Sequence, residues 1–237
     1  MNSFRLTTAH SRNRTLVIMA KAPRPGRVKT RLMESLPGAA VTALYRCLLE
    51  DTLDLARSLN EVEIAIMCPR ADVDDLIDVT GNAVQVVAQN GEGLAAGLIS
   101  VFAHFAVEQR CVIAFNSDSP HLPAAVLKNA FESLTVRDVV IGPTHDGGYY
   151  LVGAKAAYPT LFAGDGLGTT SALETLRARV QRLGLSAGFT DIFYDIDVSG
   201  DLLRLAEELQ AAPARAPRTA LWLKQWGQTI AQLRAST

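Results

Sequence analysis

The chain of 237 residues has few cysteines and no long apolar run. Cys47, Cys68 and Cys111 lie far apart and form no CxxC or Cys/His cluster, which argues against a disulfide framework and against a zinc site. Each lies in an apolar run, so we interpret them as small buried thiols and expect the protein in the reducing cytoplasm. No segment approaches the roughly 18 apolar residues of a spanning helix, so no membrane span is expected.

An excess of charge of one sign is also missing. The chain has 23 Lys and Arg against 24 Asp and Glu, a formal net charge of −1, and aromatic residues make up only 6%. General nucleic-acid binders usually carry a basic excess and stacking aromatics, so we expect no nucleic acid as a partner. Any cationic function must therefore be local, which favours a small anionic ligand.

What the sequence does contain is a regular alternation of apolar strands and amphipathic helices. Strands are predicted over residues 15–20, 62–68, 84–88, 111–115 and 139–142, with a sixth over 149–153 and a later one over 189–194. Helices are predicted over residues 37–59, 72–79, 94–108, 123–134, 169–183 and 199–209. Such repetition is typical of βαβ units, so we predict an α/β fold with a mainly parallel sheet and helices on both faces.

The two ends of the chain differ from this pattern. Residues 1–14 are polar and read as a flexible tail, and residues 15–210 as one domain. Residues 211–237 read as a linker (211–218) followed by a helix over 219–233 that packs on the same domain. Trp222 and Trp226, four residues apart, are interpreted as a stripe docking on the domain, with a homodimer contact as the alternative.

The first candidate site is the loop KAPRPGRVKTR, residues 21–31, which holds five cations in eleven residues. It follows the first strand, and ligands of parallel sheets bind at the carboxyl ends of the strands. The forked guanidinium of Arg and the ammonium of Lys both bind phosphate groups well, and Gly26 would let the backbone come close to a ligand. The loop is neither GxGxxG nor a Walker sequence, so it predicts neither a dinucleotide fingerprint nor a P-loop. A solvated basic loop is the alternative.

The second candidate site is the NSDSP segment after the fourth strand, residues 116–120. It presents Ser117, Asp118 and Ser119 at the same sheet edge, and Asp118 suits Mg²⁺ or Mn²⁺. The alternative is that Asp118 or Ser119 only caps the next helix.

Two weaker signals follow later in the chain. The segment GPTHDGGYYLVG, residues 142–153, places Asp146 after the fifth strand, although Asp-Gly-Gly is also a typical hairpin turn. One carboxylate of the stretch Asp195-Ile-Asp197 could complete a metal site begun by Asp118, or this stretch could only lead into a helix with Asp201 near its N-terminus. We interpret His121 and His145 as solvated loop residues rather than bases.

Together these strings resemble one family over about residues 15–209. AKAPRPGRVKTRL, NSDSP, GPTHDGGYYLVG, GTTSALETL and DIDVSGDL are similar to the bacterial radical-SAM-associated (selenodomain-associated) transferase family 1, described as glycosyltransferase-A-like, in the nucleotide-diphospho-sugar transferase superfamily. The resemblance implies a three-layer, Rossmann-like GT-A fold with the nucleotide at the carboxyl edge of the sheet.

The resemblance also implies roles for residues. It implies nucleotide binding by the first loop and metal binding by two aspartates, with an acceptor side at the Asp-Gly-Gly turn; to these we add Ser117 and Tyr149, which adjoin matched positions. The expected nucleotide-binding residues are Ala20, Lys21, Gly26, Lys29, Arg31 and Ser117; the metal ligands are Asp118 and Asp197; the acceptor-side residues are Asp146, Gly147, Gly148 and Tyr149. Asp118, Asp146 and Lys29 are the expected catalytic residues.

Two positions depart from the family pattern. Asn116 stands where the Asp-x-Asp metal motif has its first aspartate, so the metal would depend on Asp118 and Asp197. Leu167 stands where similar proteins often carry Trp before the Gly-Thr of the late helix, which affects the shape of the acceptor pocket.

The leading functional hypothesis is glycosyl transfer from a nucleotide-diphospho-sugar to a small-molecule acceptor, with Mg²⁺ or Mn²⁺ bridging Asp118 and the diphosphate. Nucleotidyl transfer from a nucleoside triphosphate to a phosphorylated acceptor, releasing pyrophosphate, is the first alternative. Five cations suit a triphosphate, and Lys-Thr-Arg-Leu at residues 29–32 resembles the Lys-Ser-Arg-Leu of guanylyltransferases. A non-catalytic nucleotide-binding module, with Asn116 as a mark of lost metal chemistry, is the second.

Overall fold

A computed structural model describes residues 13–107 and 110–235 of the chain. Within them, seven strands form one sheet in the order β3-β2-β1-β4-β6-β5-β7. The strands are β1 (Arg14–Met19), β2 (Glu63–Cys68), β3 (Gln85–Ala88), β4 (Cys111–Asn116), β5 (Val139–Pro143), β6 (Tyr149–Ala154) and β7 (Ala187–Phe189). Only β6 is antiparallel to its neighbours in this sheet, so the expected mainly parallel sheet is confirmed.

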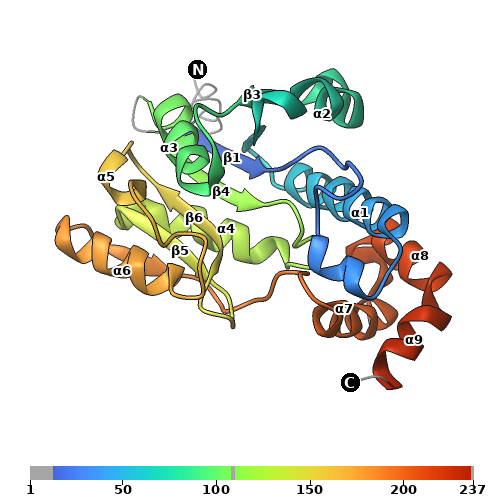
Figure 1. The fold of residues 1–237 in the computed structure, drawn as a ribbon. Coiled ribbons are helices and arrows are strands. Elements are labelled where there is room, and N and C mark those ends of the chain that lie inside the picture. Colours follow the sequence, from blue (N-terminus) through green and yellow to red (C-terminus); the bar gives the residue numbers. More distant parts are fainter. Residues whose placement is uncertain (1–12, 108–109, 236–237) are drawn as a thin grey trace, which may run out of the picture.

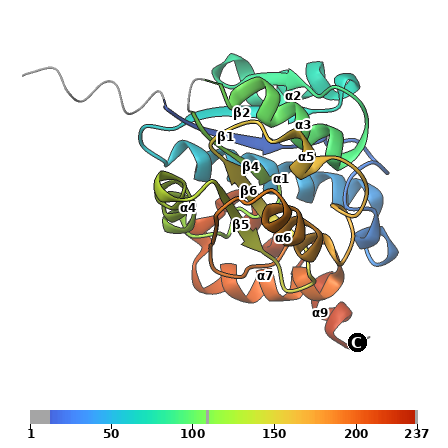
Figure 2. The ribbon, with the colours of Figure 1, turned by 90° about the vertical axis from the view of Figure 1, so that its left-hand side faces the viewer.

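Helices cover both faces of the sheet (Figures 1 and 2). One face carries α1 (Gly38–Arg57), α2 (Val73–Thr80) and α4 (Ala124–Val136), and the other carries α3 (Gly93–Phe105), α5 (Pro159–Phe162) and α6 (Ala172–Arg182). Along β1, Leu16 and Ile18 join the first core and Val17 joins the second, because successive strand residues face opposite sides. This confirms the three-layer α/β fold.

A third apolar cluster lies on the outer side of α1. It joins α1 to α7 (Ser199–Ala211), α8 (Pro217–Gln225) and α9 (Gly227–Ala235), with the short η5 (Pro213–Arg215) between α7 and α8. Asp51 of α1 accepts hydrogen bonds from the backbone N–H groups of Arg218 (3.2 Å) and Thr219 (2.8 Å). A buried carboxylate from α1 thus satisfies donors at the N-terminus of α8 that have no partner within their own helix.

The C-terminal segment corrects one prediction. The single helix expected over residues 219–233 is two helices, which meet at Trp226 and Gly227. The Trp222 and Trp226 rings stack at 5.6 Å, with Trp222 buried in the third cluster. Of the expected tail, residues 1–12 lie outside the described residues, and Arg14 already begins β1.

Two other predicted elements were misplaced. The strand expected over 189–194 lies at Ala187–Phe189, and beyond it Thr144 and Phe193 form only an isolated bridge. Gly188 lies close to α4, because a β-carbon there would meet the Ser133 hydroxyl unless that side chain moved. The helix expected from residue 169 begins at Ala172, because residues 169–171 form a turn in which Thr169 Oγ1 accepts from the Ser171 N–H (3.3 Å).

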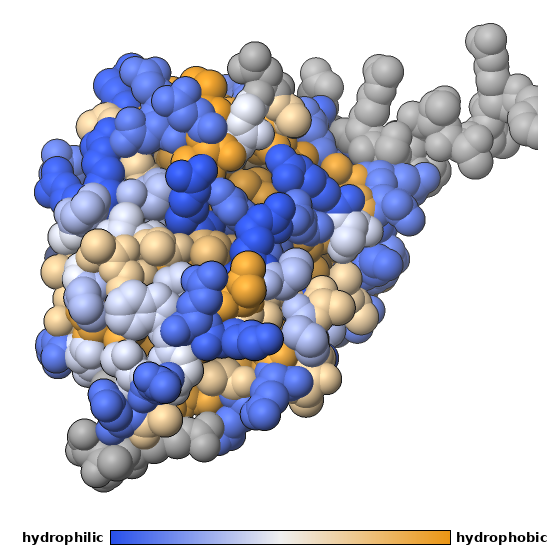
Figure 3. Space-filling view, turned by 90° about the vertical axis from the view of Figure 1, so that its right-hand side faces the viewer, coloured by the Kyte–Doolittle hydropathy of each residue, from blue (hydrophilic) through white to orange (hydrophobic). Residues whose placement is uncertain are grey.

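The carboxyl ends of β1 to β4 meet at one edge of the sheet, on the right in Figure 1. From β1 the chain crosses to β2 on one side, whereas β4 lies on the other, so a topological switch point falls between β1 and β4. Figure 3 faces this edge and shows strongly hydrophilic residues across its middle, with apolar patches between them. Within the described residues, no helix is long and apolar enough to cross a membrane.

Candidate active site

A cavity of about 560 Å³ opens at this switch point. Nearly half of its lining comes from the end of β1 and the segment that follows: Met19, Ala20, Lys21, Arg27, Val28, Lys29, Thr30 and Arg31. The rest comes from five other segments: Tyr45, Met67, Pro69, Gln89, Gly93, Leu94, Ser117, Asp118 and Asp197. The basic loop, the segment after β4 and the late aspartate, identified separately in the sequence, therefore meet in one place.

Lys29 contacts both Asp118 and Asp197. Its Nζ donates to Asp118 Oδ2 in a very short contact and to Asp197 Oδ1 at 2.8 Å. The Lys29 side chain is only 8% exposed. Burial opposes ionisation of Asp197, but the charge and hydrogen bond of Lys29, with the charge of Arg31, hold the pKa of Asp197 below its usual range. Two carboxylates thus share one ammonium.

A hydroxyl bridge joins the first loop to the segment after β4. The Lys21 N–H donates to the Tyr45 hydroxyl (3.1 Å), which is hydrogen-bonded to Ser117 Oγ (2.9 Å). Tyr45 projects from α1, and its burial raises the pKa of its hydroxyl, so it stays neutral. Sequence reasoning missed Tyr45, because nothing in a helical pattern distinguishes it from a core residue.

The five cations of the basic loop do not share one role. Arg24 is bound to α2 and the short turn before it, through Asp75 (2.6 Å) and Asp72 (3.1 Å). Lys21, Arg27 and Arg31 form no ion pair with any described residue, and all three line the cavity. Gly26 does not line the cavity; its φ of +73° gives the turn its left-handed conformation.

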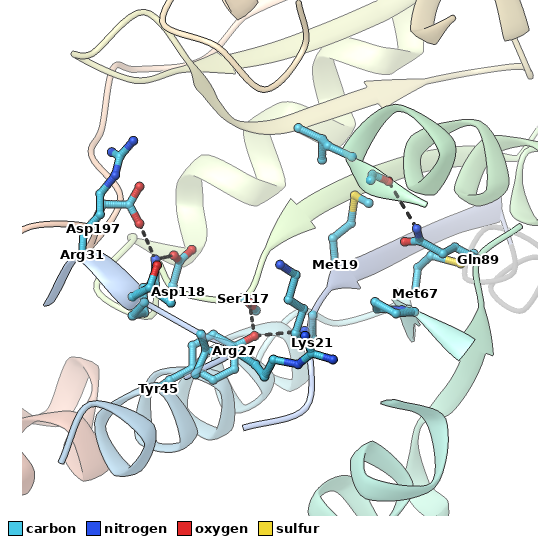
Figure 4. Close-up of a pocket in the computed structure, with 17 residues that line it drawn as sticks. Met19, Lys21, Arg27, Arg31, Tyr45, Met67, Gln89, Ser117, Asp118 and Asp197 are labelled. Atoms are coloured by element: carbon cyan, nitrogen blue, oxygen red, sulfur yellow. Dashed lines mark hydrogen bonds and ion pairs between the residues drawn. The ribbon is translucent and has the colours of Figure 1, made fainter. Parts of the chain in front are cut away.

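The end of the cavity away from Asp118 and Asp197 is largely apolar. Figure 4 shows Met19, Met67 and Gln89 on one side of Lys21, and Asp118 and Asp197 on the other. The Gln89 amide donates to the carbonyls of Gly91 (3.0 Å) and Gly93 (3.2 Å). Sequence reasoning missed this end, although Pro69 and Gln89 directly follow the second and third strands and could have been found by that position.

Asn116 is not among the residues that line the cavity, and its Oδ1 is buried without a hydrogen-bond partner among the described residues. Its Nδ2 donates to Ser119 Oγ (2.9 Å) and to Asp195 Oδ1 (2.8 Å). Burial raises the pKa of Asp195 to about 7 despite the nearby charge of Lys29. The sequence had offered the stretch of Asp195 and Asp197 as a source of one metal ligand or as a helix entry, and the pairing of Asp195 with Asn116 was not foreseen.

The Asp-Gly-Gly turn lies outside the cavity lining. Asp146 Oδ1 accepts from Thr144 Oγ1 (2.5 Å) and from the Gly148 N–H (3.1 Å), so the turn is closed by its own aspartate. Gly147 has a φ of +86°, and a β-carbon there would collide with the Thr170 carbonyl oxygen. The charge of Asp146 nevertheless reaches the main site, because it helps to raise the pKa of Asp195.

Three further positions can be compared with their expectations. Tyr149 donates to the Leu167 carbonyl (3.2 Å), and the Leu167 side chain is buried in the second core. His145 is exposed, as expected. His121 is buried, which corrects the expectation of a solvated residue: it packs on Tyr194 with ring centroids 4.5 Å apart.

Comparisons with known proteins show a family match over part of the chain and a shared fold. Residues 52–169 match the family model "Uncharacterized protein conserved in bacteria (DUF2064)". No curated protein matches the chain significantly. A solved structure from Desulfovibrio desulfuricans G20, described as a candidate nucleotide-diphospho-sugar transferase, is 25% identical, has a TM-score of 0.86, and covers 93% of this chain and 97% of its own.

Two more distant structures share the fold. One is 4-diphosphocytidyl-2C-methyl-D-erythritol synthase from Anaerococcus prevotii DSM 20548, with 12% identity, a TM-score of 0.58, and coverage of 84% of this chain and 97% of its own. The other is CMP:2-keto-3-deoxy-manno-octonic acid synthetase complexed with CTP. It has 12% identity and a TM-score of 0.54, and the match covers 85% of this chain and 99% of its own. The nucleotide-diphospho-sugar transferase fold is therefore established, and the narrower radical-SAM-associated family stays a prediction.

Proposed function

Because residues 52–169, about half of the chain, belong to the DUF2064 family and the chain has the nucleotide-diphospho-sugar transferase fold, we propose that it transfers a glycosyl group from a nucleotide-diphospho-sugar to a small acceptor. The observation that carries the proposal is the order of groups along one cavity. An apolar end at Met19 and Met67 is followed by Lys21 and Arg27 and then by two carboxylates, with Arg31 beside Asp197 (Figure 4). That order fits a nucleotide-diphospho-sugar with its base at the apolar end and its diphosphate, which is part of the leaving group, at the cations, with the metal at the carboxylates.

The phosphates are assigned to Lys21, Arg27 and Arg31. These loop cations form no ion pair with a described carboxylate, although the charge of Arg31 acts on Asp197, and all three line the cavity. Negative charge grows on the diphosphate as the glycosidic bond breaks, and fixed cations stabilise it. With Arg24 held by Asp72 and Asp75, the loop offers fewer free cations than the sequence suggested, which favours a diphosphate over a triphosphate.

Asp118 and Asp197 fit a divalent cation. Their oxygens already converge on one cationic atom, the Lys29 ammonium, and two carboxylates with phosphate oxygens and water are a usual Mg²⁺ set. Within the described residues no group of three or more His, Cys, Asp or Glu side chains could hold a metal alone, so the substrate would have to complete the ligand set. When bound, the metal would supply charge stabilisation for the leaving diphosphate.

The acceptor side is assigned to the Asp-Gly-Gly turn. Asp146 Oδ1 is occupied within the turn, which leaves Oδ2 to orient an acceptor hydroxyl or to take its proton. Gly147, Gly148 and Tyr149 would hold the turn against the loop over residues 167–171, through the close approach of Gly147 to Thr170 and the hydrogen bond from Tyr149 to Leu167.

Nucleotidyl transfer is the second candidate. One observation favours it: the fold is shared with a synthetase whose structure holds CTP. In that reaction the same cations would stabilise pyrophosphate as the leaving group. The two reactions therefore differ in which bond of the donor breaks, and their products separate them.

The test is a panel of nucleoside di- and triphosphates and nucleotide sugars, screened by thermal shift with and without Mg²⁺ or Mn²⁺. A stabilising nucleotide is then incubated with candidate acceptors. Release of nucleoside diphosphate supports glycosyl transfer, whereas release of pyrophosphate supports nucleotidyl transfer.

Two variants complete the test. We expect Asp118→Asn to lower turnover on the order of 100-fold or more, because it removes a carboxylate from the reacting end of the cavity. The matched control is Asp191→Asn, which neutralises an exposed carboxylate that does not line the cavity. Metal-independent nucleotide binding that survives Asp118→Asn, without any turnover, would point to the non-catalytic module instead.

A further inference from the structure

We propose that the Lys29 ammonium is a placeholder, occupying the position of the divalent cation when no nucleotide is bound. It keeps the metal out of the site until the phosphates of a nucleotide attract the ammonium to a new position. The inference rests on the proposed metal and nucleotide site and assigns a regulatory role to one of its residues. With this role for Lys29, the metal and the nucleotide bind cooperatively rather than independently.

The first argument is position. The Lys29 ammonium contacts Asp118 and Asp197 at once, at the point where their oxygens converge. Lys29 is also the only side-chain partner of Asp118 among the described residues. A metal ion bound to both carboxylates would sit about 2.1 Å from their oxygens. Because Lys29 Nζ is within 2.8 Å of Asp197 Oδ1, the two cations cannot use this point together.

The second argument is burial. The side chains of Lys29 and Asp118 are 8% and 11% exposed. A buried charge is tolerated only when it is paired, and removing one partner leaves the other uncompensated. The ammonium can therefore leave the two carboxylates only when a metal ion takes its place there and other oxygens, such as those of a phosphate, receive it.

The third argument is the place to which Lys29 can move. It lines the same cavity as Lys21, Arg27 and Arg31, where the phosphates are assigned. A diphosphate in this space would offer the ammonium new oxygens at the moment when the carboxylates accept a metal. By thermodynamic linkage, each ligand then raises the affinity for the other by the same factor.

The decisive experiment measures Mn²⁺ binding without any nucleotide, by the electron paramagnetic resonance signal of free Mn²⁺. We expect Lys29→Met to bind Mn²⁺ on the order of tenfold more tightly than the unmodified chain, since a unit charge is removed from beside the metal. Arg27→Met is the matched control. It removes the same charge from the same loop at a residue without a carboxylate contact among the described residues, so a smaller change is expected.

A second measurement uses the unmodified chain and does not depend on how a variant folds. Reductive methylation of lysines, read by mass spectrometry, reports how accessible each amine is. Lys29 should react slowly without metal and faster with saturating Mn²⁺, while the exposed Lys128 of α4 reacts equally in both states.

Either of the two measurements can overturn the proposed role of Lys29. Equal Mn²⁺ affinity in Lys29→Met and the unmodified chain, or Lys29 methylation that ignores bound Mn²⁺, overturns the placeholder role. Neither measurement contains a nucleotide, so failure to find a donor would contradict the proposed function and leave this result standing.

Discussion

Arg24 donates from Nε to Asp75 Oδ2 across 2.6 Å, and this pair ties the basic loop to α2. The same side chain reaches Asp72 and the Ala71 carbonyl, so a residue that looks like a phosphate ligand in the sequence is a structural latch. Arg27 of the same loop, by contrast, forms no ion pair with any described residue and lines the cavity.

The latch predicts different effects for two arginines of the same loop. Arg24→Met should lower the thermal unfolding midpoint measurably, because it releases the loop from α2. Arg27→Met should leave the midpoint unchanged and weaken nucleotide affinity about tenfold, because it removes a phosphate donor. Differential scanning fluorimetry and isothermal titration with the stabilising nucleotide measure the two effects. Unchanged stability together with lost affinity in Arg24→Met would contradict the latch.

Tyr45 predicts a coupling between stability and binding. Tyr45→Phe removes a buried hydroxyl that joins the Lys21 N–H to Ser117 Oγ. We expect a loss of about 1 kcal/mol in the free energy of unfolding and weaker nucleotide binding, because both flanking segments lose a shared anchor. Tyr158→Phe is the control, since its hydroxyl forms no hydrogen bond with any described residue. Equal effects of the two substitutions in urea unfolding would argue against the bridge.

Gly147 predicts that the acceptor-side turn does not accept a side chain. Gly147→Ala combines a φ of +86° with a collision against the Thr170 carbonyl, so we expect a loss of at least about 2 kcal/mol in unfolding free energy. In Gly200→Ala, within α7, the new methyl group meets open space and the backbone is not left-handed. That control should be neutral or slightly stabilising in denaturant titrations. If Gly147→Ala lowered the free energy of unfolding only slightly, the turn and the loop over residues 167–171 would be able to move apart at little cost.

His121 predicts a pH dependence of stability. Burial, with the charges of Arg204 and Arg215, lowers the pKa of His121 from 6.5 to about 4. The unfolded chain therefore takes up a proton near pH 6.5, whereas the folded chain resists it. The contribution is fully present above pH 6.5 and is lost progressively as the pH falls towards 4, by about 3 kcal/mol in all.

The measurement is urea unfolding between pH 7 and pH 4.5 for the unmodified chain and for His121→Leu. Other groups titrate in this range, so the difference between the two chains isolates His121. Its neutral ring packs on Tyr194, and an apolar replacement should remove this part of the pH dependence. Parallel stability curves for the two chains would show that His121 is not held neutral.

Much of the fold follows from local patterns in the sequence. The apolar runs at residues 15–20 and 111–115 lie at β1 and β4, because a buried parallel strand needs apolar residues on both faces. The misplaced elements are those in which a tertiary contact overrides the pattern. Near residue 189 the apolar alternation continues, but the chain leaves the sheet where Thr190 and Asp191 meet the Tyr150 hydroxyl.

The sequence by itself determined the α/β fold and the segments that end at its carboxyl edge, since strand period and turn residues are properties of neighbouring positions. Only the tertiary structure decided how the five cations of one loop divide their roles. Arg24 meets Asp72 across 48 positions, and Lys29 meets Asp197 across 168. The physical reason is that ion pairs and burial depend on distances in space, which a local pattern does not contain.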